Sequence, residues 1–466
     1  MKSDTKRKTE ITVMKKFLIV LAVAVMQVVS AMAADGERLH SEWKFAKPGK
    51  SKRGTEFLAT GRYGASGTSA DLVFYRNGKK PARGEQDGLT LSEKGYPTAE
   101  FANAKDCWVL EMDVEKLASG TVADLWLNVV TEPVDVPYGF VVEYLDGKKW
   151  LPVAPLDVNG VNYTTSASAK HPKNLWTTVR MANAVNDGRV AFRLRCVQGA
   201  FPVKVSVMSP SRSGRLTQMT CYDERIPQDT LRALFLGNSY TYYHTYPVIF
   251  KEVAWHEGHY VDGNAWVSGG YTMKAHLANK HSRAAVDEGG YDYVFLQDQS
   301  ILPTLIGTAD DAGSLDYMKQ MVERVKEKSP TAKPVIEITW GRKFGNNNFG
   351  KYEPLLEKYP QFYADYDAMQ SRLIEVVTLE AETLGTMISP VGIAWRIVRR
   401  ERPDIELYAK DAHHQSYAGS YLAAVVAYLT IYRTPFGANP ADAALDAPTA
   451  AYLRSVAERV VLGGEK

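Results

Sequence analysis

The sequence has little cysteine and therefore offers little support for thiol chemistry. Its 466 residues include only three cysteines, Cys107, Cys196 and Cys221. None lies in the helical or basic surroundings that lower the pKa of a reactive thiol, so we assign them no chemical role. In an oxidising compartment Cys107 and Cys196 could form a disulfide, but three buried thiols fit the sequence equally well.

The chain also lacks a large excess of charge of either sign. Its formal net charge is +3, and residues 1–33 contribute six Lys/Arg and two Asp/Glu, so the remainder carries about −1 (3 − 6 + 2). Proteins that bind nucleic acid by their surface charge are strongly basic. We therefore expect no nucleic-acid partner.

An apolar run near the N-terminus is too short to be a convincing membrane span. It covers residues 17–29, follows Lys15 and Lys16, and ends in small residues with an Ala-x-Ala cleavage pattern. Residues 1–33 are predicted to be a signal peptide, with no membrane span after cleavage. No cysteine directly follows the cleavage site to carry a lipid anchor, so we expect a periplasmic or extracellular protein.

The histidines do not match a compact zinc pattern. Four of them cluster in sequence, namely His256, His259, His276 and His281, but they alternate with ordinary helix residues. We interpret them as surface or capping histidines and predict no metal site.

The first half of the chain reads as short strands. Alternating apolar and polar runs, such as residues 108–112, 138–144 and 190–196, are separated by Asp-Gly and Asn-Gly turn pairs. This pattern predicts an all-β, jelly-roll-like sandwich over residues 34–215. Accessory domains of this kind on exported enzymes often bind sugars.

Four aromatic residues in this half have two interpretations. They form either a sugar-stacking platform or part of the core, and only their exposure separates the two. They are Trp126, Trp150, Tyr163 and Trp176.

The second half alternates strands with helices. Small and polar residues at 209–214 suggest a linker, which separates residues 34–215 from an α/β domain with a mostly parallel sheet at 216–466. Strands are predicted at 231–237, 260–268, 291–296 and 334–340, and the longest helices at 361–384 and 417–432.

Ser239 is the candidate nucleophile because it follows the buried strand that ends at Gly237. Its other interpretation is a helix N-cap. A catalytic serine needs a base and an orienting acid, and Asp411 precedes two histidines, His413 and His414. An Asp three residues before a His can accept from its Nδ1 while Nε2 faces the serine. Composition does not separate the two histidines.

Two further residues follow a predicted strand on the same edge of the sheet. Ligands of open α/β sheets bind at the carboxyl ends of the strands. Trp340 could therefore wall a pocket, and Arg342 could pair with an anionic substrate such as a uronate. A structural tryptophan and a rim arginine are the alternatives.

The order of the motifs resembles that of the SGNH (GDSL-like) hydrolase superfamily. The blocks are Gly-Asn-Ser at 237–239, Ser-Gly-Gly-Tyr-Thr at 268–272, Gln-Asp-Gln-Ser at 297–300, and Asp-x-x-His at 411–414. They look like a branch common in gut Bacteroidetes with a Gln-x-Gln-Ser third block. The resemblance covers roughly residues 230–437 and implies a three-layer α/β/α domain.

The resemblance also assigns catalytic roles. It implies Ser239 as nucleophile, His414 as general base and Asp411 as its orienting acid, because the family places the histidine three residues after the aspartate. His413 is then a neighbour or a substrate contact.

An oxyanion hole is implied by the same blocks. Its donors would be the amides of Ser239 and Gly270, with Gly269 as the alternative register. The family usually has an asparagine in the third block, where this chain has Gln299, and Gln297 is a second candidate for that donor.

The resemblance implies a secreted serine esterase that needs no cofactor and acts on a small-molecule or glycan ester, above all an O-acetylated carbohydrate. A lipid or thioester hydrolase of the same fold is one alternative and should show a broad apolar groove. A non-catalytic glycan-binding protein is another, if the changed third block has dismantled the oxyanion hole.

Overall fold

The computed structural model describes most of the chain after residue 37. Leu39–Lys466 group as one compact unit. The predicted signal peptide at 1–33 and the predicted linker at 209–214 lie outside the described residues. The residues that the structure describes are 38–43, 62–64, 66–67, 70–81, 89–91, 97–113, 121–131, 137–165, 173–181, 189–207, 217–223 and 230–465, without 439 and 444.

A run of parallel strands forms the centre of the second half, and the prediction of a mixed α/β architecture is confirmed. The strands pair in the order β20-β19-β18-β16-β17, and each pair within this run is parallel. Their bounds are β16 (Thr230–Gly237), β17 (Tyr260–Ser268), β18 (Tyr293–Leu296), β19 (Lys333–Glu337) and β20 (Met387–Ser389).

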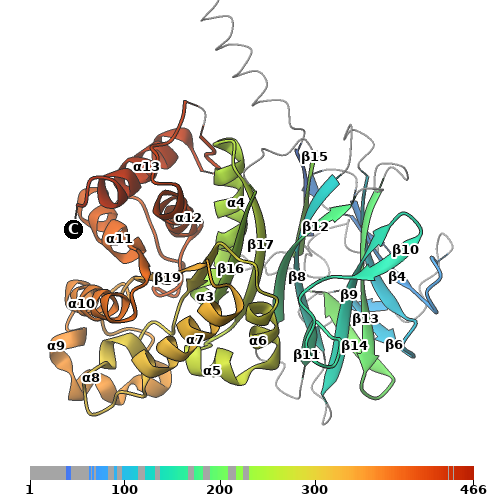
Figure 1. Ribbon diagram of the computed structural model, residues 1–466, viewed down its shortest axis with the longest axis horizontal. Helices are drawn as coiled ribbons and strands as arrows, with labels where there is room; N and C mark the ends of the chain where they lie inside the picture. The colour runs from blue at the N-terminus through green and yellow to red at the C-terminus, as the bar shows by residue number, and fades with distance from the viewer. Residues whose placement is uncertain are drawn as a thin grey trace, which may run out of the picture. The chain divides into compact units, whose positions relative to one another are not determined.

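Helices cover both faces of these strands (Figure 1). Successive side chains of a strand point to opposite faces. On β16, Ala233 and Phe235 join one apolar core, whereas Leu234 and Leu236 join the other. The first core includes α4 (Tyr246–His256), α11 (Val391–Glu401), α12 (Tyr417–Tyr432) and α13 (Ala447–Val461). The second includes α6 (Lys280–Asp287), α7 (Ser314–Lys328) and α10 (Tyr366–Leu384).

Short helices join these elements. They are α3 (Ser239–Tyr242), η2 (Tyr243–Thr245), α5 (Met273–Ala278), η3 (Leu302–Leu305), η4 (Gly350–Tyr352), α8 (Pro354–Lys358) and α9 (Pro360–Tyr363).

The predicted boundaries agree with the structure to within one residue except at three ends, one of which is the start of β18 at Tyr293 in place of residue 291. Helix α12 matches its predicted range, and Gly385 closes α10 in the left-handed conformation with φ 60°. The predicted start of α10 at residue 361 is wrong, because the Asp365 side chain accepts from the amide of Ala368 and caps a helix that begins at Tyr366. Strand β19 ends at Glu337, before the predicted end at residue 340.

The first half consists of antiparallel strands, and one of them extends the parallel sheet. Strand β12 pairs antiparallel with β17 on one side and with β8 on the other. The sheet continues through β14, β6 and β5, and β15, β1 and β3 also belong to it. A second sheet runs β10-β9-β13-β7-β4-β2, with β11 paired to β9.

The bounds of these strands are as follows. In the first sheet they are β1 (Arg38–Trp43), β3 (Ser66–Gly67), β5 (Leu89–Leu91), β6 (Pro97–Phe101), β8 (Thr121–Thr131), β12 (Lys173–Met181), β14 (Val203–Val207) and β15 (Thr217–Asp223). In the second they are β2 (Arg62–Gly64), β4 (Ala70–Tyr75), β7 (Cys107–Asp113), β9 (Tyr138–Asp146), β10 (Lys149–Pro152), β11 (Tyr163–Thr165) and β13 (Arg189–Gln198).

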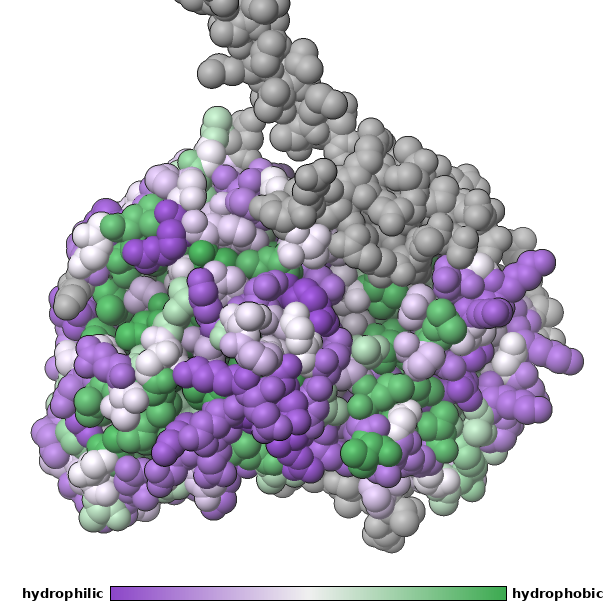
Figure 2. Space-filling view, in the orientation of Figure 1, coloured by the Kyte–Doolittle hydropathy of each residue, from purple (hydrophilic) through white to green (hydrophobic). Residues whose placement is uncertain are grey.

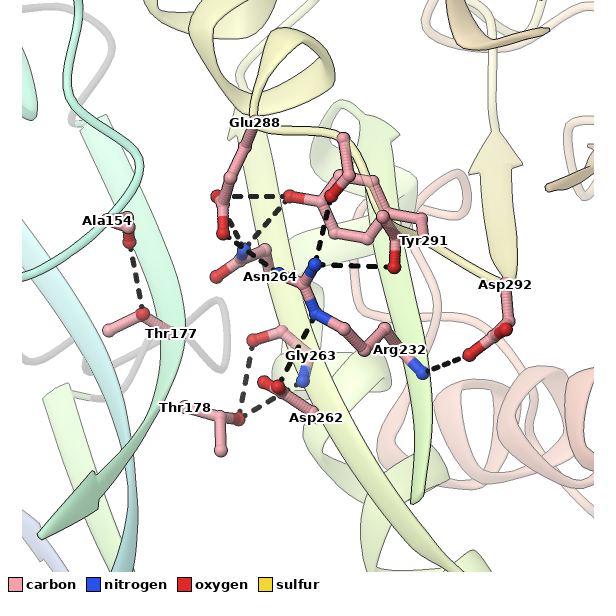
Figure 3. A network of polar contacts seen from close by, with 12 residues as sticks. Ala154, Thr177, Thr178, Arg232, Asp262, Gly263, Asn264, Glu288, Tyr291 and Asp292 are labelled. Carbon is pink, nitrogen blue, oxygen red and sulfur yellow. Dashed lines mark hydrogen bonds and ion pairs between the residues drawn. The ribbon is translucent and has the colours of Figure 1, made fainter. Parts of the chain in front are cut away.

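Polar contacts hold β12 against β17 and tie down the amino ends of the parallel strands (Figure 3). The Thr178 hydroxyl accepts from the amide of Gly263 at 3.1 Å, which joins β12 to β17. At the start of β16, the Arg232 guanidinium contacts Glu288 at 2.9 Å, and its amide donates to Asp292 at 2.8 Å. These structural contacts occupy the amino ends of the strands, and the candidate site lies at the opposite, carboxyl ends.

The alternative of a disulfide between Cys107 and Cys196 is wrong. All three cysteines are free and buried. Cys107 on β7 lies opposite Arg195 of β13, so the next residue, Cys196, points to the other face of the sheet. Burial raises the pKa of both thiols to about 12, which keeps them protonated and unreactive.

Three of the four aromatic residues that were candidates for a sugar-stacking platform belong to the core. Trp126, Tyr163 and Trp176 are almost fully buried. Trp150 is half-buried, and the Arg193 guanidinium lies 4.5 Å from the centre of its ring. They therefore do not form a shared stacking surface.

Hydrophilic and hydrophobic residues are interspersed on the face shown in Figure 2, with a broad hydrophilic band over its middle. Within the described part of the chain, no helix combines the length and apolar character needed to cross a bilayer.

A buried carboxyl group at the end of β19 makes stability depend on pH. Glu337 is 4% exposed, and its Oε1 has no hydrogen-bond partner among the described residues. Burial raises its pKa from 4.5 to about 8. Because the unfolded chain ionises this group at the lower value, its contribution to stability is complete below about pH 4.5 and is lost as the pH rises towards 8.

We therefore expect Glu337→Gln to stabilise the protein more at pH 8 than at pH 5. The gain in melting temperature over the wild type should be larger at pH 8 by about 2 °C or more, measured by thermal unfolding. Glu323→Gln, on the exposed face of α7, is the control and should show no such difference. Equal gains at both pH values for Glu337→Gln would contradict the assignment.

Candidate active site

The serine predicted as nucleophile lies where β16 turns into α3. Asn238, and not Ser239, caps this helix, because its Oδ1 accepts from the amide of Tyr240 at 3.1 Å. The capping interpretation of Ser239 is therefore wrong. Gly237 is required at the turn, since a Cβ there would lie 2.1 Å from Thr241 Oγ1.

Asn238 also joins the turn to the other two loops of the site. Its Nδ2 donates to the carbonyl of Tyr271 at 2.9 Å and to that of Asp298 at 3.3 Å. Its backbone amide donates to Gln297 Oε1 at 3.0 Å. One side chain thus sets the distance between the serine and the loops at 268–272 and 297–300. This role of Asn238 could not be predicted from the sequence, because its partners lie more than thirty residues away.

The loop between α11 and α12 supplies an aspartate–histidine pair. His414 Nδ1 lies 2.7 Å from Asp411 Oδ2, and Asp411 Oδ1 accepts from the amides of His413 at 3.1 Å and His414 at 2.9 Å. The carboxylate contact requires a proton on Nδ1, which leaves Nε2 as the basic nitrogen of His414. The geometry is that of a general base with an orienting acid.

The charge state of Asp411 suits that role. Burial raises its pKa, but the hydrogen bonds from the ring and amide of His414 outweigh this effect, with a smaller contribution from the charge of Arg342. The net pKa lies below the ordinary value of 3.8, so the carboxylate is ionised at neutral pH.

Two residues without a predicted role hold the histidine loop against the residues that follow Ser239. The ring of Tyr243 stacks on that of His414, with the centroids 4.0 Å apart and the planes 5° from parallel. The Gln415 Nε2 donates to the carbonyls of Tyr240 at 2.7 Å and Tyr243 at 3.3 Å. These contacts join the histidine loop to the helix that begins with Ser239.

Ser239 and His414 line one pocket of about 240 Å³. The Ser239 hydroxyl has no hydrogen bond within the described part of the chain. Catalytic hydrogen bonds are often long before substrate binds, so a shared pocket is the relevant geometry here. The other residues of its lining are Asn238, Tyr240, Tyr242, Gly269, Gly270, Gln299, Ser300, Arg342 and His413.

The pocket is lined by Ser239, Gly270 and Gln299, the residues predicted to supply the oxyanion-hole donors. Gln299 Oε1 accepts from the amides of Ile301 at 2.7 Å and Leu302 at 3.1 Å. Because the oxygen is used in this way, the NH₂ group is the part of the side chain that is available to donate into the pocket. Gly270 lies in the left-handed region with φ 70°, which glycine adopts without strain. Gly269 lines the same pocket, and both registers of this block remain open.

Gln297 is not in the pocket lining. It is 2% exposed, and its Oε1 accepts from the Asn238 amide and from the Thr241 hydroxyl, each at 3.0 Å. Its Nε2 donates to the carbonyl of Asp298, so both ends of its amide group are used within the turn. Of the two glutamines weighed for the third donor, the geometry favours Gln299.

The structure separates the four residues predicted as possible substrate contacts, of which Gln297 lies outside the pocket lining as described above. Trp340 is fully buried beneath the pocket, where it stacks on Tyr240 at 4.5 Å and donates to the carbonyl of His413 at 3.2 Å. It therefore supports the histidine loop and does not form a pocket wall. Arg342 and His413 both line the pocket, and His413 Nδ1 lies 3.2 Å from His414 Nδ1.

Two of the four clustered histidines are buried, so their interpretation as surface residues is wrong. His276 is fully buried, and its two ring nitrogens lie 2.9 Å from Ser282 Oγ and 3.0 Å from the carbonyl of Gly237. His281 is 3% exposed and contacts Thr164. His276 thus supports the residue at which β16 ends.

Asp411, His413 and His414 bring potential ligand atoms within 4.8 Å of one another. Their hydrogen bonds favour a different role. The Asp411 carboxylate accepts from two backbone amides and from the His414 ring, so its oxygens are already used to orient that ring.

Comparisons with known proteins find distant likenesses only. No family profile matches the chain, and no curated protein matches it. A DUF4886 family protein from Bacteroides uniformis ATCC 8492 aligns with TM-score 0.42 and 18% identity, over 51% of this chain and 97% of its own. The YXIM_BACsu protein from Bacillus subtilis aligns with TM-score 0.36 and 14% identity, over 72% and 84%.

A family two carbohydrate esterase from Clostridium thermocellum, in complex with cellohexaose, aligns with TM-score 0.29 and 13% identity, over 73% of this chain and 96% of its own. Function depends on the residues of a site and not on such distant similarity.

Proposed function

We propose that this protein is an exported serine esterase of SGNH type. In this proposal residues 34–215 form an accessory β-sandwich and residues 216–466 a three-layer α/β/α catalytic domain. The main support for this proposal is that Ser239 and His414 line one pocket, and that His414 Nδ1 is hydrogen-bonded to Asp411. A nucleophile, a base and an orienting acid are the groups that acyl transfer requires.

The reaction follows from these positions. Ser239 Oγ attacks the ester carbonyl carbon and its proton passes to His414 Nε2, while Asp411 stays ionised and holds the ring. The carbonyl oxygen becomes an oxyanion, which accepts from the amides of Ser239 and Gly270 and from Gln299. The ester C–O bond then breaks, and His414 returns the proton to the leaving alkoxide. Water cleaves the acyl-enzyme with His414 again as base, which releases the acid and restores the serine.

The pocket supports a small acyl group as the part of the ester that is removed. Its volume of about 240 Å³ favours acetyl over a long acyl chain. A lipid or thioester hydrolase would need an apolar groove beside the serine. We therefore favour O-acetyl esters of a carbohydrate as the substrate class, and the placement of Gln299 argues against a protein that only binds glycans.

A fluorophosphonate probe tests the proposal on the purified mature protein. It reacts with activated serines, and we expect one adduct on the peptide that contains Ser239, together with loss of p-nitrophenyl acetate hydrolysis. Turnover should fall as the acyl chain of the p-nitrophenyl ester lengthens from two carbons to eight. Labelling of another serine would contradict the proposal, and faster hydrolysis of the longer ester would favour the lipid alternative.

A further inference from the structure

Arg342 is a buried cation at the edge of the candidate active site. It is 3% exposed, yet it lines the same pocket as Ser239 and His414. Its Nε and Nη1 are enclosed and have no hydrogen-bond partner, and the guanidinium forms no ion pair within the described part of the chain. Nη2 has no hydrogen bond among these residues either. Unlike Nε and Nη1, it is not fully buried.

The surroundings of Arg342 hold it in place without neutralising it. Its backbone amide donates to Met369 Sδ at 3.2 Å, and its guanidinium lies 5.9 Å from the centre of the Phe349 ring, which gives a weak cation–π contact. The charge of Arg342 lowers the pKa of the Asp411 carboxyl, so the two groups interact electrostatically. The Asp411 oxygens, however, already accept hydrogen bonds from the His414 ring and from two backbone amides. Burying a charged group without acceptors is unfavourable, and a bound anion would remove that penalty.

The charges around the pocket define the kind of anion. Among the residues of its lining, Arg342 alone carries a permanent positive charge, and no acidic side chain is present. One guanidinium matches a single negative charge, and its planar fork suits the two oxygens of a carboxylate. A dianionic phosphate would call for a second cation.

We propose that Arg342 binds a carboxylate of the substrate, so that the esters hydrolysed here belong to acidic sugars such as uronic acids. The inference rests on the proposed function, because it places the carboxylate in the pocket where Ser239 attacks the ester. A bound carboxylate would also supply the acceptors that the buried Arg342 guanidinium lacks.

Binding without catalysis tests the site first. The Ser239→Ala protein is titrated with glucuronate and with glucose, which differ only in the carboxylate at C6, by calorimetry at millimolar ligand. We expect glucuronate to bind at least about tenfold more tightly, as for a charge-assisted hydrogen bond. Arg342→Gln on the same background should remove this preference, and Arg342→Lys, which keeps the charge but not the fork, should retain part of it. Arg400→Gln, an exposed arginine paired with Asp367, is the matched control and should keep the full preference.

A kinetic measurement with otherwise wild-type protein tests the link to hydrolysis. Acetate release is followed from O-acetylated glucuronate and from O-acetylated glucose. We expect the ratio of their kcat/KM values to be at least about ten, through a lower KM for the acidic ester, and to fall towards one in Arg342→Gln.

The outcomes separate the two proposals. Glucuronate binding that depends on Arg342, without hydrolysis of any ester, would uphold the anion site and overturn the proposed enzyme. Ester hydrolysis without an acidic preference, or a preference that survives Arg342→Gln in a folded protein, would overturn the anion site alone. Tighter binding of glucose 6-sulfate than of glucuronate would overturn the assignment to a carboxylate.

Discussion

Ser239→Ala and His414→Ala are each expected to lower kcat for p-nitrophenyl acetate by about ten-thousand-fold or more. The first removes the attacking oxygen, and the second removes the nitrogen that accepts its proton. Because the two residues act as a unit, the double variant should be hardly slower than either single one. The measurement is initial rates at saturating substrate, with circular dichroism to check that each variant is folded.

His413→Ala is the matched control for His414→Ala. Both histidines line the pocket and are adjacent in the loop, but only His414 places its Nδ1 on the Asp411 carboxylate, at 2.7 Å. We expect His413→Ala to cost at most about tenfold in kcat, since it removes a neighbour and not the base. The reverse order of the two losses would assign the base to His413, and turnover that survives Ser239→Ala would exclude the serine mechanism.

Gln299→Ala is expected to lower kcat about a hundred- to a thousandfold, the usual cost of one oxyanion donor. The Gln299 oxygen is held by the amides of Ile301 and Leu302, so its NH₂ group is directed without further reorganisation. The loss should appear in kcat with little change in KM, because the donor acts on a charge that develops only in the transition state.

Gln297→Ala provides the contrast within the same motif. This glutamine accepts from the Asn238 amide and the Thr241 hydroxyl in a buried turn, so its truncation leaves buried donors unpaired. We expect a lower melting temperature for Gln297→Ala and a smaller fall for Gln299→Ala, which also frees two backbone amides but lies at the pocket and is less buried. If Gln299→Ala loses stability but not kcat, the third donor is not Gln299.

Much of the secondary structure could be predicted because it depends on local pattern. The apolar run that ends at Gly237, the helix at 417–432 and the glycine after α10 were all readable from spacing and turn chemistry. The errors have local causes that the pattern concealed. Asp365 starts α10 later than its apolar periodicity suggests, and a shift of one residue along β13 puts Cys196 on the opposite face from Cys107.

The candidate site was predictable only where its contacts are short in sequence. Asp411 and His414 are three residues apart on one loop, so their hydrogen bond follows from spacing alone. Trp340 could not be placed in this way, since its position beneath Tyr240 depends on a partner about a hundred residues earlier. The buried state of His276 was hidden for the same reason, because its contact with Gly237 joins two distant segments.

The sequence by itself determined the alternation of strands and helices, the serine at the end of a strand and the Asp-x-x-His spacing, because each depends on residues that are neighbours along the chain. The tertiary structure decided what lies across the pocket. It brought Tyr243 and Gln415 together around the histidine loop, separated Gln299 from Gln297, and buried Arg342 without an acidic partner. Such contacts join segments tens to hundreds of residues apart, and only the packing of the helices on the sheet sets them.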